Sequence, residues 1–192
     1  MERVFPDTNV LYPISIADLT LRLADLEVHE VIWSADLLAE VERVLVGDKG
    51  LTPDEAAYFC KCIRTAFPEG EIAKGDYAEL VESRTGPDPD DHVHSAAAVA
   101  GGATVLLTAD NRGFPKRDLG AVRRVGPDTY FLEQLEAFPE EVIGVLGEMG
   151  ASRREPQPID ETLLALAAAG MPKFAAEVRR LLGEAPASSP RR

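Results

Sequence analysis

The segment that best indicates the fold of this chain is near the N-terminus and reads Val4-Phe5-Pro6-Asp7-Thr8-Asn9-Val10-Leu11. A short apolar run ends at Asp7, and a helix-like pattern of residues follows it. An α/β sheet commonly presents a carboxylate in this way, at the C-terminal end of a strand and in the crevice where ligands bind. We therefore predict that Asp7 is a functional residue, although the same side chain would also suit a helix cap.

The rest of the chain alternates strand-like and helix-like segments around this stretch. Four short apolar runs are predicted as strands, at residues 3–6, 31–33, 104–107 and 121–125. The last run contains two arginines and is expected at a sheet edge. Strands that alternate with helices predict a three-layer α/β/α domain with a central, mostly parallel sheet.

The C-terminal part of the sequence reads as helical throughout. Residues 139–183 are predicted as a helical extension, which ends in a small hairpin with helices at 159–169 and 172–182. That hairpin is too small to fold alone and must pack on another part of the protein or on a partner. We assign residues 1–138 to the α/β domain and residues 184–192 to a disordered tail.

The composition narrows the class of protein. A chain of 192 residues with 45% hydrophobic residues suits one globular domain with an appendage. No apolar run is long enough to cross a bilayer and the N-terminus lacks a secretory signal, so we expect a cytoplasmic location. Cys60 and Cys62 lie two apart in a helix-like stretch and are expected to be ordinary reduced thiols.

The charge distribution bears on what the protein binds. The net charge of −13 argues against broad, nonspecific binding to nucleic acid. Residues 1–150 carry 13 Lys and Arg against 28 Asp and Glu, yet the segment 111–126 holds five of those cations. This basic segment either flanks the site of an anionic substrate or protects a sheet edge, and the sequence does not separate the two.

Three further acids occupy positions comparable to that of Asp7. Glu40 lies within an apolar helix at 37–45, Asp91 opens a helix, and Asp110 follows the strand at 104–107. We predict that the four acids meet in one pocket. Mg²⁺ and Mn²⁺ prefer oxygen ligands, and such a metal relieves the repulsion between crowded carboxylates and activates water. The pattern therefore predicts metal-assisted phosphodiester hydrolysis.

Two of these positions have competitors nearby. Glu40 and Glu42 flank the apolar stripe of the same helix on opposite edges, so geometry does not choose between them. Asp88, Asp90 and Asp91 form a cluster in which one acid is expected to act only as a helix cap. The prolines and the glycine of the segment 86–90 predict irregular structure there.

Other polar residues have plainer interpretations. Asp110 could be a turn former together with Asn111. The three histidines, His29, His92 and His94, are expected at the surface rather than as metal ligands.

Taken in order, four segments resemble the motifs of PIN-domain nucleases, in a match that covers about residues 1–138. They are Pro6 to Leu11, Ser34 to Leu45, Asp88 to Ala97 and Leu107 to Pro115. In the second segment the resemblance favours Glu40 over Glu42. In the fourth, related chains often carry an Asp where this one has Gly113, which is not an expected ligand.

The resemblance implies a PIN-like fold and a ribonuclease that depends on Mg²⁺ or Mn²⁺. Its metal ligands, which are also the catalytic residues, would be Asp7, Glu40, Asp91 and Asp110, with Asn9 and Thr108 orienting ligands or water around them. Many bacterial members of this size are VapC-like toxins that form homodimers and are inhibited by a VapB-like antitoxin. The C-terminal hairpin resembles extensions found on some VapC-like chains.

Three other functions remain open on the sequence. The chain could be a housekeeping RNA-processing nuclease without an antitoxin, or a PIN-like binding module that has lost catalysis. A receiver domain on a similar sheet is a third alternative, but the sequence lacks the early pair of acids at a strand end that such a domain needs.

Overall fold

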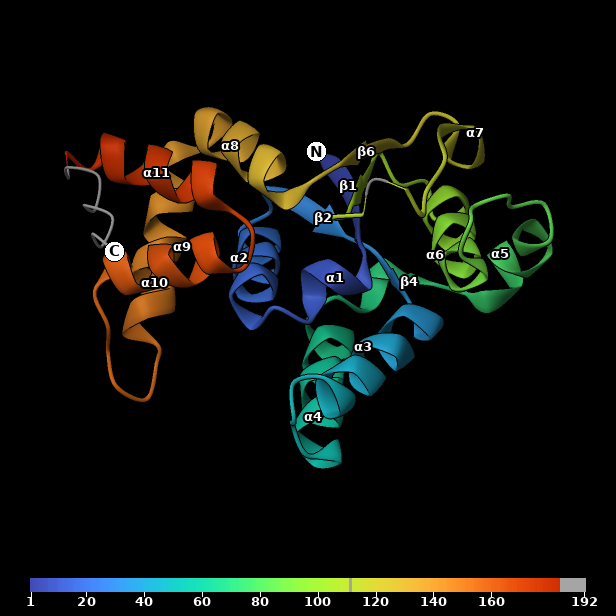
Figure 1. Cartoon of the computed structure of the whole chain (residues 1–192), viewed down its shortest axis with the longest axis horizontal. Helices are drawn as coiled ribbons and strands as arrows, with labels where there is room; N and C mark the ends of the chain where they lie inside the picture. Colours follow the sequence, from blue (N-terminus) through green and yellow to red (C-terminus); the bar gives the residue numbers. More distant parts are fainter. Residues whose placement is uncertain (111, 184–192) are drawn as a thin grey trace, which may run out of the picture. The chain divides into compact units, whose positions relative to one another are not determined.

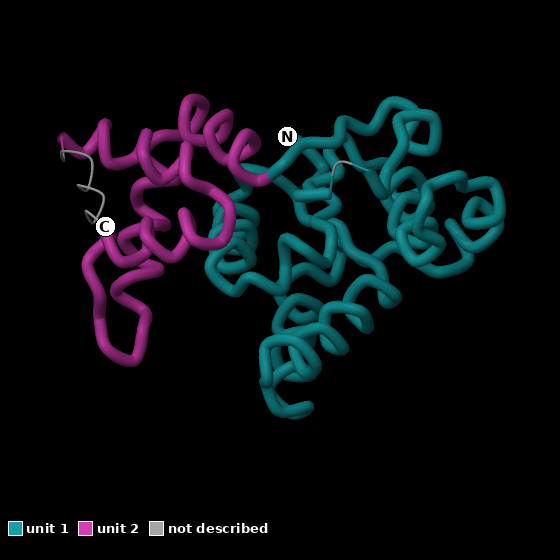
Figure 2. Tube along the Cα trace, viewed as in Figure 1, with its two compact units in different colours: residues 1–126 teal, residues 127–192 magenta. Residues whose placement is uncertain are grey.

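The computed structural model describes residues 1–110 and 112–183, and the tail expected at 184–192 lies outside the described residues. The chain divides into two compact units, residues 1–126 and residues 127–192 (Figure 2). The sequence-based division after residue 138 differs from this one by a single helix, which packs with the helices that follow it.

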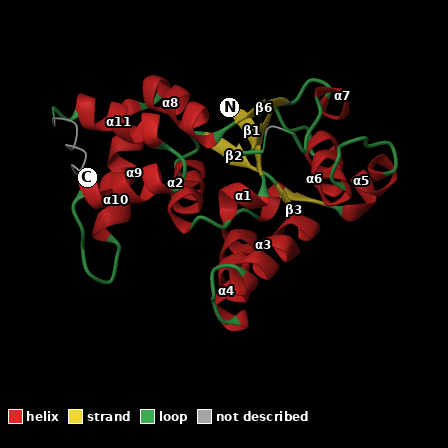
Figure 3. Ribbon diagram, viewed as in Figure 1, coloured by secondary structure: helices red, strands yellow, loops and turns green. Residues whose placement is uncertain are grey.

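A four-stranded parallel sheet forms the centre of the first unit (Figure 3). Its strands are β1 (Glu2–Pro6), β2 (His29–Val31), β5 (Val105–Leu107) and β6 (Arg123–Val125), in the order β2-β1-β5-β6. The expected parallel arrangement and the edge position of β6 are therefore confirmed. Pro6 pairs with Leu107, so β1 and β5 end at the same level and the residues after them become neighbours.

The strand predicted at 31–33 is divided between two sheets. Ile32 still donates its backbone N–H to the Val4 carbonyl at 2.9 Å, but β3 (Trp33–Ser34) pairs with β4 (Glu71–Ile72) in a separate two-stranded sheet. The Trp33 indole, 1% exposed, donates Nε1–H to the Phe67 carbonyl at 2.8 Å. The strand thus leaves the main sheet at the residue where the large Trp33 side chain is buried against the segment that contains Phe67.

Helices follow the strands much as the apolar periodicity predicts. In the first unit they are α1 (Thr8–Leu11), α2 (Ile14–Asp25), α3 (Ala35–Gly47), α4 (Pro53–Ala66), α5 (Lys74–Val81), α6 (Pro89–Ala100) and α7 (Lys116–Leu119) (Figure 1). Ser34 caps α3 and Thr52 forms a capping box with Glu55 at the start of α4. The neighbouring pairs α3–α4 and α5–α6 make the most extensive helix contacts of the unit.

Helix α6 begins earlier than the sequence predicted. The segment 86–90 was expected to be irregular throughout, and this is wrong for its last two residues, which belong to the first turn of α6. Asp88 caps the helix by accepting from the Asp90 N–H at 3.0 Å, and Pro89 occupies the first helical position, where its missing N–H costs nothing. The cap in the acid cluster is thus Asp88, which leaves Asp91 in the first turn.

The second unit contains four helices over its described residues. They are α8 (Pro127–Ala137), α9 (Pro139–Ala151), α10 (Ile159–Ala168) and α11 (Pro172–Leu181). Phe131 and Phe174 pack with ring centroids 6.0 Å apart, and Asp128 accepts from the Phe174 N–H at 2.8 Å, which ties α8 to the start of α11. Over the described part of the chain, no helix is long and apolar enough to cross a membrane.

Candidate functional site

Asp7 lies directly after β1 and is held by three donors. Its Oδ1 accepts from the Thr8 N–H at 2.8 Å, which caps α1, and its Oδ2 accepts from the Thr108 hydroxyl at 2.7 Å and from the Asn9 amide. The carboxylate is only 4% exposed. Asp7 therefore acts as a cap and is also a buried charge with a fixed orientation.

Asn9 and Thr108 join the two loops that leave β1 and β5. The Asn9 amide donates to the Thr108 hydroxyl at 3.0 Å and its Oδ1 accepts from the Ala109 N–H at 2.9 Å. The same Thr108 hydroxyl accepts from the Asp110 N–H at 3.0 Å. This network fixes the backbone of Asp110 relative to the carboxylate of Asp7.

Asp91 and Asp110 converge on Gly113. A Cβ atom built on Gly113 would overlap the Oδ2 atoms of both acids. Because glycine has no side chain, both carboxylates can lie against the backbone at this position. Asp110 also acts as a turn former, because its carboxylate accepts from the N–H groups of Arg112 at 2.7 Å and Gly113 at 3.0 Å. Asp110 therefore stabilises a turn, as one interpretation of the sequence predicted, and it also lies beside Asp91.

The pKa values report on the crowding of these acids. Burial, and after it the negative charges of Asp7, Asp88 and Asp110, raise the pKa of Asp91 to about 6. Burial also raises the pKa of Asp7, against the opposing effects of the Thr108 hydrogen bond and of His94. Three of the predicted acids, Asp7, Asp91 and Asp110, thus lie close enough to repel one another.

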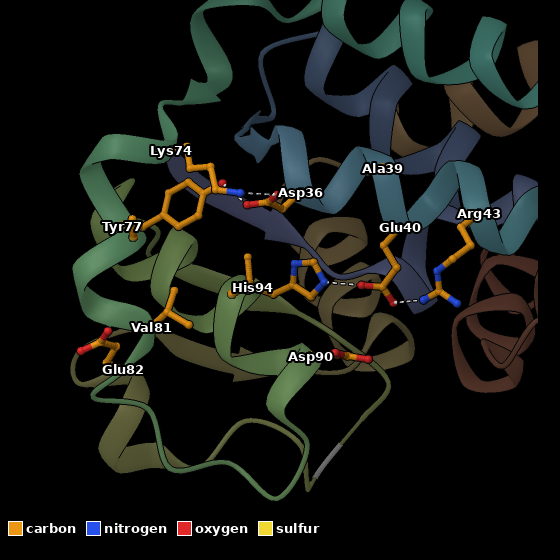
Figure 4. Close-up of a pocket in the computed structure, with 12 residues that line it drawn as sticks. Asp36, Ala39, Glu40, Arg43, Lys74, Tyr77, Val81, Glu82, Asp90 and His94 are labelled. Carbon is orange, nitrogen blue, oxygen red and sulfur yellow. Dashed lines mark hydrogen bonds and ion pairs between the residues drawn. The ribbon is translucent and has the colours of Figure 1, made fainter.

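Glu40, the fourth predicted acid, lies on α3, and its negative charge is, after burial, among the causes that raise the pKa of Asp7. Figure 4 shows its side chain between His94 and Arg43. Its Oε2 lies 2.5 Å from His94 Nε2, and its Oε1 lies 3.8 Å from Arg43. The hydrogen bond from His94 lowers the pKa of Glu40, and the positive charges of His94 and Arg43 add to that effect. Glu42 lies elsewhere, near Cys60 of α4, whose pKa its charge helps to raise.

His94 is the residue of this site that the sequence interpretation missed. The histidines were expected at the surface, which is wrong for His94 at 3% exposed and for His29 at 1% exposed. His94 lies three residues after Asp91 on α6, so the two side chains share a helix face. That spacing was the available signal, whereas the partner, Glu40, is 54 residues away in sequence.

The chemistry of the cluster fits a hard divalent cation that keeps its waters. All four acids offer carboxylate oxygens, the donors that Mg²⁺ and Mn²⁺ prefer. Over residues 1–110 and 112–183, no group of three His, Cys, Asp or Glu side chains lies close enough together to hold a metal ion by itself. Mg²⁺ commonly binds through one or two carboxylates and several waters, so the convergent pair Asp91 and Asp110, next to Asp7, suffices for that mode.

Comparison with known proteins gives matches over both units. Residues 3–112 match the family described as "PIN domain", and residues 127–180 match the family described as "VapC50 C-terminal domain". The chain is 31% identical over 130 residues to a protein of Mycobacterium tuberculosis (strain ATCC 25618 / H37Rv) named "Putative ribonuclease VapC50", a match that covers 67% of this chain and 71% of that protein. No solved structure matches.

Proposed function

Because this chain belongs to the PIN-domain family, as a VapC-like member with a C-terminal extension, we propose that it is a divalent-metal-dependent endoribonuclease. The observation that carries this proposal is the convergence of acids from separate parts of the chain. Asp7 follows β1, Asp91 lies on α6 and Asp110 follows β5, yet the charges of Asp7 and Asp110 both raise the pKa of Asp91. Such repulsion is costly unless a cation neutralises it.

In this proposal Asp7, Asp91 and Asp110 hold the cation, with Glu40 completing the site. A bound Mg²⁺ or Mn²⁺ supplies charge neutralisation, a water of lowered pKa and stabilisation of the phosphoryl oxygens. The chain keeps these ligands in place. Asn9 and Thr108 fix Asp7 and the Asp110 backbone, and His94 fixes Glu40.

The catalytic proposal is tested by RNA cleavage with a single matched pair of variants. Asp7→Asn removes one charge from the cluster and keeps the shape of the side chain, and we expect it to abolish cleavage while the circular dichroism spectrum stays unchanged. Asp25→Asn makes the same change at an exposed position on α2 and should cleave at the wild-type rate. Cleavage by Asp7→Asn at the wild-type rate would refute the assignment of Asp7.

We further propose that the protein is the toxin of a VapBC-type pair, acting in the cytoplasm as a homodimer and inhibited by a VapB-like antitoxin. Support comes from the match to a protein named VapC50 and from the match of residues 127–180 to its C-terminal domain family. Growth arrest on induced expression, relieved by the product of a small adjacent reading frame, is the expected result. Normal growth with active enzyme would instead identify a housekeeping RNA-processing nuclease.

A further inference from the structure

A pocket of about 780 Å³ lies between α3, α5 and α6, and Glu40 and His94 are among the residues that line it (Figure 4). Ala39, Ala78, Val81 and Val93 give it an apolar wall. Most of the other lining residues are polar or charged, and a pocket of this size is large enough for a small molecule or for part of a larger ligand. The metal site proposed above uses Glu40 and His94 and gives no role to the other residues of this pocket.

The pocket is lined by two cations and by the carboxylates of Asp36, Glu40, Glu82 and Asp90. Arg43 on α3 pairs with Glu40 at 3.8 Å and Lys74 on α5 pairs with Asp36 at 3.1 Å, and the two cationic side chains are 70% and 71% exposed. They come from different helices, and Figure 4 shows Lys74 directed toward Asp36 and Arg43 directed toward Glu40. Exposed cations at the entrance of a pocket are suited to phosphate oxygens of a nucleic-acid strand.

Asp36 presents a carboxylate of fixed orientation in the same pocket. Its Oδ2 accepts from the Tyr77 hydroxyl at 2.7 Å and its Oδ1 accepts from Lys74 Nζ at 3.1 Å. Burial raises the pKa of Asp36, but these two hydrogen bonds outweigh burial and leave the pKa below its ordinary value. A carboxylate offers about four acceptor positions. Each oxygen therefore keeps room for a further donor from a ligand.

The pocket is continuous with the acid cluster. Glu40 and His94 line it, and so does Asp90, the chain neighbour of Asp91. Because Glu40 belongs to both sites, an RNA strand with a phosphate at the cluster can extend an adjacent nucleotide toward this pocket. The apolar wall, the two cations and the carboxylate correspond to the base, the phosphate and the base-edge donors of one nucleotide.

We propose that this pocket binds a nucleotide adjacent to the cleaved phosphodiester, and that Asp36 recognises its base. The inference rests on the proposed ribonuclease function and names which part of the RNA the enzyme selects. A carboxylate accepts from base amino groups. Guanine presents an N–H beside an amino group, and adenine and cytosine each present an amino group. Uracil places carbonyl oxygens on both sides of its single N–H, so a carboxylate disfavours it.

The test combines cleavage kinetics with the identity of the base next to each cut. Total bacterial RNA is digested with wild-type enzyme in Mg²⁺ or Mn²⁺, and fragment ends are sequenced. A synthetic RNA carrying the strongest cut site then gives kcat and KM for the variants. Ala78→Trp fills the pocket from an exposed position on α5, and Ala57→Trp is the matched control on the exposed face of α4.

Ala78→Trp should raise KM about tenfold, the size of one lost nucleotide contact, with kcat close to wild type. Ala57→Trp should behave as wild type in both constants. Asp36→Asn replaces one acceptor oxygen by a donor and should remove the bias against uracil at the neighbouring position, with cutting at uracil-flanked sites rising relative to the others.

The other outcomes separate three claims: that the pocket binds a nucleotide, that Asp36 recognises its base, and that the protein is a ribonuclease. If wild type cleaves RNA and Ala78→Trp has wild-type kcat and KM, the pocket assignment fails and the ribonuclease function stands. If Asp36→Asn keeps the wild-type base bias, the role given to Asp36 fails. If wild type cleaves no RNA with either metal, the proposed function fails and the nucleotide pocket with it.

Discussion

Asp91→Asn should stabilise the metal-free protein, because the native carboxylate is held among other negative charges. The pKa of Asp91 is raised from 3.8 to about 6, chiefly by burial and then by Asp7, Asp88 and Asp110. At about 1.4 kcal/mol for each pKa unit, this difference corresponds to about 3 kcal/mol at pH 7. The side chain is half-buried, so solvent screening reduces the expected gain to about 1–2 kcal/mol.

The pH dependence gives the sign of this effect. An acid whose folded pKa is raised contributes no penalty below its unfolded pKa near 4, and its penalty grows as the pH rises through about 6. The stability difference between Asp91→Asn and wild type should therefore be near zero at pH 4 and reach its full value at pH 7. Urea denaturation in EDTA, repeated across this range, measures the difference directly.

Metal should reverse the order of the two proteins. A cation that binds the folded protein stabilises it by an amount that grows with the logarithm of the ratio of its concentration to its dissociation constant. The variant lacks one of the carboxylates that we propose to hold the cation. Equal stability of the two proteins at pH 7 in EDTA, or a difference that does not change with pH, would mean that burial and the neighbouring charges do not destabilise the ionised Asp91 carboxylate. Asp25→Asn, an exposed acid on α2, is the control and should show neither effect.

Three further predictions concern neighbours of the cluster and a buried histidine. His94→Leu removes a hydrogen bond to the charged Glu40 and should lower the free energy of unfolding by about 2 kcal/mol. His94→Gln keeps an N–H donor and should restore most of that free energy. Urea denaturation measures both variants. Gly113→Ala should reduce RNA cleavage about a hundredfold, because the added methyl displaces the two carboxylates that converge there and a displacement of 1 Å is enough for such a loss. His29, whose pKa burial lowers to about 4, should make stability fall by up to about 3 kcal/mol as the pH drops from 6.5 to 4, and His29→Gln should flatten that slope.

Each of these predictions has a result that contradicts it. Wild-type stability of His94→Leu would mean that the bond to Glu40 contributes nothing. Full activity of Gly113→Ala would mean that the carboxylates rearrange freely around a methyl group. A His29→Gln protein with the wild-type loss of stability toward pH 4 would place that loss on other groups.

The parts of the fold that follow from local periodicity were predictable from the sequence. Buried parallel strands are continuous apolar runs, and their carboxyl ends share one edge of the sheet, so an acid after each of two such runs indicated that Asp7 and Asp110 would be neighbours. The caps of α3 and α4 were equally local, because Ser34 and Thr52 act within three residues of themselves.

The features that the sequence did not predict depend on contacts between distant segments. A histidine on an alanine-rich helix gives the same pattern whether it faces solvent or a partner, so the pairing of His94 with Glu40 left no periodic signal. The change of sheet after Ile32 goes together with pairing to β4 and with the contact of Trp33 with Phe67, which is 34 residues away. Gly113 was taken only as a departure from related chains, whereas its role is to leave space for two side chains on other segments.

The choice between Glu40 and Glu42 shows the same limit at a single residue. Helical spacing placed the two acids on opposite edges of one apolar stripe and did not separate them. The helices that contact α3 give the two acids different neighbours, since Glu40 lies against His94 of α6 and Glu42 lies near Cys60 of α4.

Titration of the purified protein with Mn²⁺ by calorimetry shows whether folding brings these acids together to bind a cation. We predict saturable binding of at least one ion per chain to the wild-type protein, strongly weakened in Asp7→Asn and unchanged in Asp25→Asn. Absence of a binding heat in the folded wild-type protein, or equal binding by all three proteins, would contradict the account.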